Sequence, residues 1–473
     1  MTTMTKNFFK KMLPIVLLSL LTAAVTISCA KEDKPEPDKP EPETPDPLGV
    51  VKKYAYDLMN DIYYWYKDVP KNINPKPIKT IQAYFDTLMV PVDRWSWMMT
   101  GQEYLSSESG IVETYGMSIS QPIDYYNDYG VRVRYVHPSS PMADNNIKRG
   151  YQLTHLNGTP VTTLIQNGTF NQVYGQRTNS FTFNNHSGQP VTFTATAREV
   201  STRSSLVSAV YGPQDFQGLP YNIGYFHYLS FKAGMLDDIH NAMAVFKAAN
   251  VKELILDLRY NGGGDSRATT LLANYIAPAS AEGKLVARRE HNDRYSSNDA
   301  DPSSQTIITR MSGSLDLDRL FILTTKGSAS ASEVILNGLK PLMNVVHIGG
   351  TTYGKPNGMY VLPYPEGNYD NPLYVFLPIC FFTVNSTGYG HYVDGLVPDH
   401  YRPDDLYHDF GMNDDWVNAV MNYITKGSFP ALPPKPGSAF EALPSHRITT
   451  PEEQENYGTY KVEFRDQKPL RSR

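Results

Sequence analysis

Cysteine is scarce in this chain, whose 473 residues include only Cys29 and Cys380. Two thiols are too few for a disulfide framework, and the sequence has neither an HExxH motif nor a cluster of Cys and His with metal-ligand spacing. Cys380 lies in an apolar run, residues 374–382, which favours a buried structural thiol over a nucleophile. We therefore expect no metal site and no cofactor.

A surplus of basic residues is also missing, since the formal net charge is −5. Without a general basic surface, nucleic acid is not expected as a partner. Hydrophobic residues make up 41% of the chain and charged residues 19%, a balance typical of globular proteins. The length predicts two or three domains.

No apolar run reaches the roughly 20 residues that a membrane-spanning helix needs. The longest, residues 12–27, follows three lysines, and this pattern is typical of a signal peptide over residues 1–29. Ser28-Cys29 ends the run and resembles the lipobox of bacterial lipoproteins, which implies that Cys29 is acylated and becomes the mature N-terminus. Thr26 stands where Leu is commonest, so ordinary signal cleavage stays open as the alternative.

The acidic and basic residues just after Cys29 are similar to the surface-export signal of Bacteroidetes lipoproteins. Both resemblances imply an exported protein that is lipid-anchored to the cell envelope, at the outer membrane or the cell surface. Cys380 then has no partner for a disulfide.

Composition divides the rest of the chain into five parts. Residues 30–48 form a linker rich in Pro and acidic residues, which holds an extended backbone. Apolar residues at three-to-four spacing predict a small helical cap over residues 49–103, with a second helix at 78–89. Short alternating runs such as residues 131–136 predict strands over residues 104–200. The largest part, residues 201–425, is followed by a tail, residues 426–473. The tail contains one candidate strand at 458–464, and the sequence does not indicate its function.

The largest segment, residues 201–425, alternates strand-like and helix-like stretches, which predicts an α/β fold with a mixed, mostly parallel sheet. The predicted strands and helices, in chain order, are strand 223–231, helix 235–249, strand 253–258, helix 269–276, strand 319–324 and helix 332–343.

Part of the strand-rich segment resembles the second half of PDZ domains of bacterial proteases. The resemblance rests on Pro138-Ser-Ser-Pro-Met-Ala, on Ile147-Lys-Arg-Gly-Tyr-Gln-Leu and on Leu156-Asn-Gly-Thr-Pro-Val. It departs at Tyr151, where Asp is usual. The resemblance implies an inserted PDZ-like β-rich domain over residues 104–200 that binds an extended chain end by strand addition. The amides near Tyr115, Gly116 and Met117 are our candidates for holding the terminal carboxylate.

Three motifs in the α/β segment together resemble the S41 family of C-terminal processing peptidases. They are Leu254-Ile-Leu-Asp-Leu-Arg-Tyr-Asn-Gly-Gly-Gly, Gly327-Ser-Ala-Ser-Ala-Ser-Glu and Thr352-Tyr-Gly-Lys, and Val393-Asp-Gly-Leu-Val-Pro-Asp resembles the family's closing element. In this family the nucleophilic Ser and the Lys are 25 positions apart, as Ser330 and Lys355 are. The resemblance implies an S41 protease core over residues 201–425 with a Ser330/Lys355 dyad.

The residue types suit this chemistry on physical grounds. Ser330 precedes a helical run, and the unpaired N–H groups at a helix start favour the negative charge of a serine alkoxide. A lysine such as Lys355 removes the serine proton when burial lowers its pKa toward neutrality. Amides of Gly263 and Ala331 are candidates for an oxyanion hole, a contribution often worth about 3 kcal/mol per donor. Glu333 is expected to support the site as a helix cap.

Two departures from the family concern the orientation of the lysine. Many members carry Gln four residues after the Lys, where this chain has Met359, and another branch has Asp eleven after the Ser, where this chain has Pro341. Another group must therefore orient Lys355. The candidates are Asn337, Asn357 and Asn385, which the sequence does not rank.

The sequence predicts a serine endopeptidase that acts on protein or peptide substrates through an acyl-enzyme. A histidine-based triad is the competing enzyme mechanism, because His347, His391 and Asp394 lie in the same segment, although outside any recognised triad motif. A lipoprotein that has lost catalysis and binds peptides or another nutrient is the alternative function. The intact Ser330/Lys355 pair favours the enzyme. Oligomeric state, substrate sequence and the glycine of the oxyanion hole stay open.

Overall fold

The structure is a computed structural model that describes residues 46, 48–120, 130–432 and 459–463, the last five by their backbone alone. The predicted signal peptide, Cys29 and nearly all of the linker lie outside these residues, so their predictions are untested. Asp46 onward forms one compact unit. Within the described ranges, no helix combines the length and the apolar character that crossing a membrane requires.

A six-stranded sheet forms the centre of the α/β segment, in the order β10-β11-β12-β16-β17-β21. Only the β10–β11 pair is antiparallel, which agrees with the predicted mostly parallel sheet. Its strands are β10 (Ser205–Tyr211), β11 (Ile223–Tyr228), β12 (Glu253–Asp257), β16 (Arg319–Thr324), β17 (Asn344–Gly349) and β21 (His400–Tyr401).

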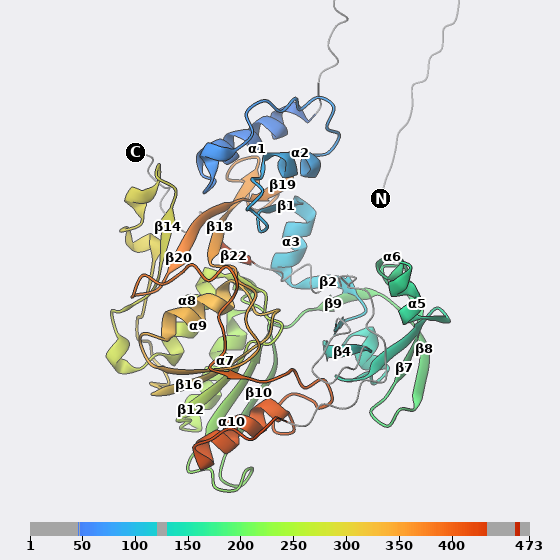
Figure 1. The fold of residues 1–473 in the computed structure, drawn as a ribbon, viewed down its shortest axis with the longest axis vertical. Helices are drawn as coiled ribbons and strands as arrows, with labels where there is room; N and C mark the ends of the chain where they lie inside the picture. The colour runs from blue at the N-terminus through green and yellow to red at the C-terminus, as the bar shows by residue number, and fades with distance from the viewer. Residues whose placement is uncertain (1–45, 47, 121–129, 433–458, 464–473) are drawn as a thin grey trace, which may run out of the picture. The chain divides into compact units, whose positions relative to one another are not determined.

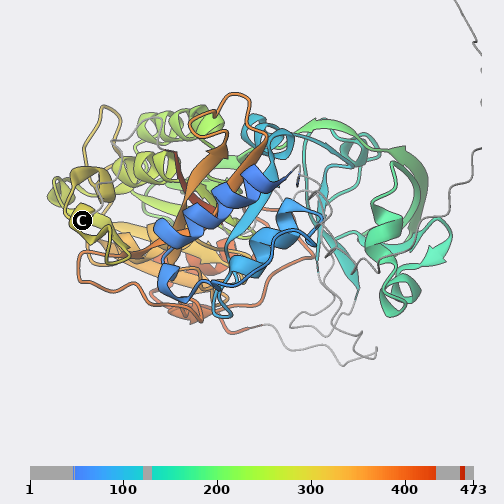
Figure 2. The same ribbon diagram turned by 90° about the horizontal axis from the view of Figure 1, so that it is seen from above.

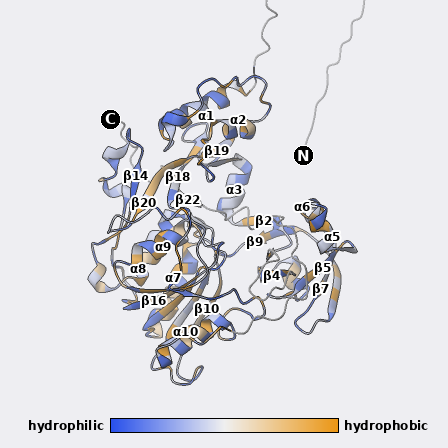
Figure 3. Ribbon diagram, viewed as in Figure 1, coloured by the Kyte–Doolittle hydropathy of each residue, from blue (hydrophilic) through white to orange (hydrophobic). Residues whose placement is uncertain are grey.

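Helices cover both faces of this sheet (Figure 1), which explains why its central strands are apolar without alternation. On one face, Leu254 and Leu256 join a core with α7 (Leu236–Ala248), α8 (Ser266–Ile276) and α9 (Ala331–Leu339). On the other face, Ile255 packs in a core with Trp416 of α10 (Asp415–Lys426). In Figure 3 the region around β16 is accordingly coloured as hydrophobic.

A second sheet, largely antiparallel, was not anticipated from the sequence. Its path is β1-β19-β18-β20-β14-β15, and two further strands, β13 and β22, join it beside β18. The bounds are β1 (Trp97–Thr100), β13 (Gly263–Asp265), β14 (Leu285–His291), β15 (Gln305–Ile307), β18 (Asn357–Tyr364), β19 (Tyr374–Leu377), β20 (Ile379–Val384) and β22 (Thr459–Glu463).

The predicted helical cap packs on this second sheet. Its elements are α1 (Gly49–Asp61), the short 3₁₀ turn η1 (Tyr66–Asp68), α2 (Ile81–Leu88) and α3 (Gly101–Ser109). Figure 2 shows α1 running across the strands that include β18, and the Tyr54 hydroxyl donates to the Pro363 carbonyl at 2.9 Å. The predicted boundary at residue 103 falls inside α3.

Residues 111–201 form a β-rich module with its own core, built around Met117, Val133, Leu153 and Phe181. Strands β2 and β9 pair where the module begins and ends. The elements are β2 (Ile111–Thr114), β3 (Met117–Ile119), β4 (Val131–Val136), α4 (Pro141–Asp144), β5 (Gln152–Leu156), β6 (Thr159–Pro160), α5 (Val161–Gln166), α6 (Phe170–Tyr174), β7 (Thr178–Asn184), β8 (Pro190–Thr196) and β9 (Arg198–Ser201).

Local sequence explains where the helices near the motifs begin and end. α8 begins at Ser266 because Asp265 caps it, accepting from the Arg267 amide at 2.7 Å. The helix predicted over 332–343 ends at Leu339, two residues before Pro341, because Pro341 has no amide N–H to donate to the next helical turn. Four short 3₁₀ turns complete the fold: η2 (Ala233–Met235), η3 (Ala279–Ala281), η4 (Ser296–Asn298) and η5 (Pro302–Ser304).

Candidate active site

Ser330 lies at the turn between β16 and α9, as the N-cap of α9. Its backbone has φ 59° and ψ −110°, a conformation that residues other than glycine rarely adopt. Such strain costs on the order of 1–3 kcal/mol and persists where the surrounding structure imposes it, commonly at functional sites. The turn presents the Ser330 side chain at the start of a helix that is buried along its whole length.

The three serines of the nucleophile motif differ in their partners. Ser328 Oγ donates to the Leu258 carbonyl at 2.7 Å, and Ser332 Oγ donates to the Asn261 carbonyl at 2.9 Å. Both hydroxyls therefore hold the motif against the glycine loop. The Oγ of Ser330 is buried and has no hydrogen-bond partner among the residues that the structure describes. Of the three, Ser330 alone keeps its hydroxyl available for another group.

Glu333 connects the nucleophile motif to the lysine motif. Its Oε2 accepts from the Ser330 amide at 2.7 Å and from the Lys355 amide at 2.9 Å. Its Oε1 accepts from the Thr352 hydroxyl at 2.6 Å and from the Gly354 amide at 2.7 Å. One carboxylate oxygen thus holds the backbones of Ser330 and Lys355 together. Glu333 is a helix cap, as the sequence indicates, and also the clamp between the two motifs.

The Lys355 side chain is 1% exposed. Burial lowers the pKa of its amine to about 7, although the carboxylates of Asp93 and Glu333 act in the opposite direction. At neutral pH a large fraction of Lys355 is therefore unprotonated, which is the state that accepts a proton. This is the electrostatic condition that a lysine base requires.

Asp93 and Arg94 belong to the cap, and the sequence did not point to either. Asp93 is held by the Tyr63 hydroxyl at 2.7 Å and by the Trp95 and Ser96 amides at 2.9 Å each. The Arg94 guanidinium donates to the Val393 carbonyl at 2.7 Å and also contacts the Gly354 carbonyl. The cap thus brings a negative charge near Lys355 and braces the lysine motif, from a segment more than two hundred residues earlier.

The glycine loop after β12 packs against the nucleophile motif through Asn261. The Asn261 carbonyl accepts from the Ala329 amide at 3.0 Å, and its side chain donates to the Tyr228 carbonyl at 2.8 Å. The Asn261 Oδ1 accepts from the Gly263 amide at 2.9 Å. That amide is thus engaged within its own loop, and Gly263 supplies an oxyanion donor only if this turn opens. The amide of Ala331 is in the first turn of α9, where no carbonyl of the helix itself can accept it.

The three asparagines considered for orienting Lys355 differ in whether their side-chain amides have hydrogen-bond partners. Asn385 Nδ2 donates to Asn337 Oδ1 at 3.0 Å, and Asn337 Nδ2 donates to the Tyr389 carbonyl at 2.9 Å. Asn357, two residues after Lys355, is 1% exposed, and neither end of its side-chain amide has a partner among the described residues. Asn357 is therefore the asparagine whose amide is available.

A buried charge network lies beneath the glycine loop. The Arg259 guanidinium donates to Asp257 at 2.5 and 3.0 Å and to Asp414, the N-cap of α10, at 2.7 Å. Arg149 of the β-rich module donates to Asp404 at 3.0 Å and to the Tyr260 hydroxyl at 2.9 Å. The motif that includes Arg259 and Tyr260 is thus fixed by charge to α10 and to the module.

The candidate chain-end residues lie at the start of β3, which stands at one end of the module's path of paired strands. Tyr115 and Met117 are buried, and Gly116 has φ 80° with its amide bonded to Thr114 Oγ1 at 3.0 Å. A Cβ at Gly116 would approach Ser140 Cβ to 2.1 Å, which explains the glycine. The structure brings these residues into one turn but does not test their role.

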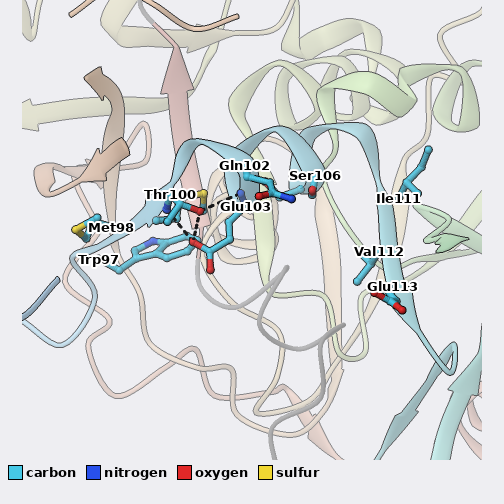
Figure 4. Close-up of a pocket in the computed structure, with 11 residues that line it drawn as sticks. Trp97, Met98, Thr100, Gln102, Glu103, Ser106, Ile111, Val112 and Glu113 are labelled. Atoms are coloured by element: carbon cyan, nitrogen blue, oxygen red, sulfur yellow. Dashed lines mark hydrogen bonds between the residues drawn. The ribbon is translucent and has the colours of Figure 1, made fainter. Parts of the chain in front are cut away.

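A cavity of about 510 Å³ lies elsewhere, along β1, α3 and β2 (Figure 4). Its lining includes Trp97, Met98, Glu103 and Ile111 and none of the predicted site residues. Figure 4 shows Glu103 bonded to Thr100 beside it. This cavity is therefore separate from the Ser330/Lys355 pair.

The structure also shows the surroundings of His347, from the alternative histidine-based triad, and of the Cys380 thiol. The ring of His347 bonds Thr324 Oγ1 at 2.6 Å, and burial lowers its pKa to about 4, so it has a partner other than Ser330. Cys380 is fully buried, as predicted, and burial raises the pKa of its thiol to about 12. Over the described part of the chain, no group of three or more His, Cys, Asp and Glu side chains has an arrangement that could hold a metal ion.

Two family models match the chain. Residues 222–371 match Peptidase family S41, and residues 51–97 match the Peptidase S41 N-terminal domain, which corresponds to the cap. The first of these matched segments contains the glycine loop, Ser330 and Lys355, so the residues of the candidate site lie within a segment that matches S41 peptidases.

The chain is also similar to curated proteins and to a solved structure. The chain is 23% identical over 303 residues to the chloroplastic Carboxyl-terminal-processing peptidase 2 of Arabidopsis thaliana, covering 64% of this chain and 57% of the relative. It is 28% identical over 135 residues to the Tail-specific protease of Haemophilus influenzae, covering 28% of this chain and 18% of the relative. The chain thus spans little more than half of the first relative and less of the second.

The fold is similar to a crystal structure from Bacteroides fragilis that is assigned to the S41 proteases. The TM-score is 0.62 at 21% identity, over 83% of this chain and 100% of the other. The α/β fold of the S41 proteases is therefore shared.

Proposed function

We propose that this protein is a serine endopeptidase in which Ser330 is the nucleophile and Lys355 the general base. The single observation that supports this most strongly is the shared clamp, because one oxygen of Glu333 accepts from the amides of both residues. The free Ser330 hydroxyl and the lowered pKa of Lys355 suit the two roles.

The proposed reaction proceeds in two steps. The Ser330 Oγ attacks the carbonyl carbon of a peptide bond while its proton passes to the Lys355 amine, and the C–N bond then breaks as that proton passes to the leaving amine. Water then attacks the ester carbonyl as Lys355 accepts a proton from the water, and that proton passes to Ser330 Oγ as the ester C–O bond breaks. The amide of Ala331, supported by the start of α9, and an amide of the glycine loop would stabilise the oxyanion.

The β-rich module would act as a PDZ-like peptide-capture domain. An edge strand such as β3 accepts an extended chain by main-chain hydrogen bonds, and the turn at Tyr115 and Gly116 leads into its first residue, Met117. The names of the relatives, which refer to carboxyl-terminal processing and tail-specific cleavage, agree with capture of a chain end.

Anchoring through an acylated Cys29 at the outer membrane or cell surface is part of the same proposal and is tested by the membrane retention of Cys29→Ala.

The decisive experiment compares the native protein with Ser330→Ala and, as matched control, Ser328→Ala, using an unfolded protein such as casein and a mechanism-based serine reagent. Ser330→Ala should abolish both cleavage and labelling, whereas Ser328→Ala removes only structural hydrogen bonds, to the Leu258 carbonyl and from the Thr325 amide, and should still label. Undiminished cleavage by Ser330→Ala would exclude Ser330 as nucleophile. A native protein that binds peptide yet neither cleaves nor labels would be a binding protein instead.

A further inference from the structure

The tail contributes one strand to the second sheet, as the sequence suggested for residues 458–464. β22 runs parallel to two strands at once, one on each side. On one side Thr459 faces Gly263 and Lys461 faces Asp265. On the other side Lys461 faces Met359 and Glu463 faces Val361. Figure 1 accordingly labels β22 beside β18.

Both neighbours of β22 begin at the candidate active site. β13 starts at Gly263 in the glycine loop, and β18 starts at Asn357, two residues after Lys355. Met359 is four residues from Lys355, about 13 Å along an extended strand. We call the space between β13 and β18 the strand slot. A chain in this slot lies between Gly263 of the glycine loop, which faces Thr459, and the strand that begins two residues after Lys355.

The slot has the properties of a binding site for an extended backbone. The other side of β13 is already paired, because the Phe231 amide donates to the Gly263 carbonyl at 2.9 Å and the Asp265 amide donates to the Phe231 carbonyl at 2.7 Å. β20 pairs with Asn357–Met359 of β18 and β19 pairs with Leu362–Tyr364, and Met359 has a partner in both β20 and β22. The main-chain N–H and C=O groups of β13 and β18 that face the slot pair with β22. Leaving such groups buried without a hydrogen-bond partner would cost free energy. The slot therefore takes an extended polypeptide.

We propose that residues 459–463 are an internal peptide ligand that occupies the substrate position of the active site and competes with substrate. The ligand class is an extended polypeptide bound by main-chain hydrogen bonds from β13 and β18. The identification of this position with that of the substrate rests on the proposed peptidase function. Occupation of the slot by the tail does not depend on turnover and is measurable by binding alone.

The binding test uses full-length protein carrying Ser330→Ala, so that no cleavage interferes. Lys461→Pro with Val462→Pro removes two successive amide donors, which point to opposite edges of a strand. Lys461→Ala with Val462→Ala is the matched control, because it shortens the same side chains and keeps both amides. The probe is a fluorescein-labelled peptide with the sequence of residues 458–464, and its apparent Kd is measured by anisotropy.

The proline pair should bind the probe at least about tenfold more tightly than the alanine pair, as expected when the tail fills about nine-tenths of the slots in the control. Equal Kd values for the two pairs would overturn the proposal. If the proline pair fails to fold, the unlabelled peptide is added to the native protein and cleavage is measured. An increase in KM with kcat unchanged, which a scrambled peptide does not cause, supports the proposal. No inhibition by the peptide overturns it.

The binding and activity results also separate the two proposals. Probe binding that differs between the pairs, in a native protein that cleaves nothing, would retain the tail as slot ligand and reject the peptidase. Cleavage that depends on Ser330, without any difference in probe binding, would reject the tail and retain the peptidase.

Discussion

The clamp formed by Glu333 gives a prediction whose size follows from its contacts. Glu333→Gln replaces one carboxylate oxygen by an amide nitrogen, which donates and cannot accept. Each oxygen of Glu333 accepts two hydrogen bonds, so two of the four are lost whichever way the new amide turns. Hydrogen bonds to charged groups contribute about 1.5–3 kcal/mol each, so the free energy of unfolding should fall by about 3–6 kcal/mol.

The chain offers a matched control in Glu103, which completes a capping box with Thr100 at the start of α3 and is exposed. Glu103→Gln should cost about 1 kcal/mol at most, as exposed capping interactions do. Urea unfolding of both variants, with linear extrapolation to water, measures the difference. If Glu333→Gln costs no more than Glu103→Gln, the buried clamp does not stabilise the junction of the two motifs and the reasoning is wrong.

Three further predictions concern groups near the lysine. The kcat/KM should rise with pH around an apparent pKa of about 7, because Lys355 must lose its proton to act as base. Asp93→Asn should shift this apparent pKa to a lower value, because it removes a carboxylate that raises the pKa of Lys355. A pH profile that does not shift would refute the influence of Asp93. Lys355→Met should raise the free energy of unfolding at pH 7. The folded state holds the pKa of Lys355 below its value in the unfolded chain, so the stability of the native protein falls as pH drops from about 10 toward 7. Urea unfolding at pH 7 and pH 9 should show a smaller gain in stability at the higher pH. Asn357→Leu should lower kcat/KM at least about tenfold, equivalent to roughly 1.4 kcal/mol. It should not lower stability, because it removes a buried amide that lacks a described partner. A kinetic assay and a thermal melt on the same preparation check the loss of activity and the unchanged stability.

The elements around the site were predictable because their signals are local. The apolar run before Asp257 predicts a buried strand, and β16 (Arg319–Thr324) has the predicted bounds. Ser330 and Lys355 follow from motif and spacing, and the structure holds their backbones on one carboxylate. The positive φ of Ser330 was not predictable, because nothing in its small neighbours demands it and the fold imposes it.

The influence of Asp93 on Lys355 had no local signal. The two residues are far apart in the sequence and meet only because the cap packs on the second sheet. The same holds for β22, whose strand character follows from its own residues while its partners, Gly263–Asp265 and Met359–Val361, depend on the completed sheet. Patterns of period two or 3.6 specify an element and its buried face, and they contain no information about which distant segment lies beside it.

The pairing of β2 with β9 has a consequence for how this protein varies over evolution. Because Ile111 faces Ser201 and Thr114 faces Arg198, the whole module begins and ends at neighbouring points of the chain. An inserted segment with adjacent ends imposes on its host a closure entropy that grows only slowly with its length. Lengthening, shortening or exchanging the module therefore leaves the host fold nearly unaffected, so the module can diverge as a unit while the rest of the fold is retained.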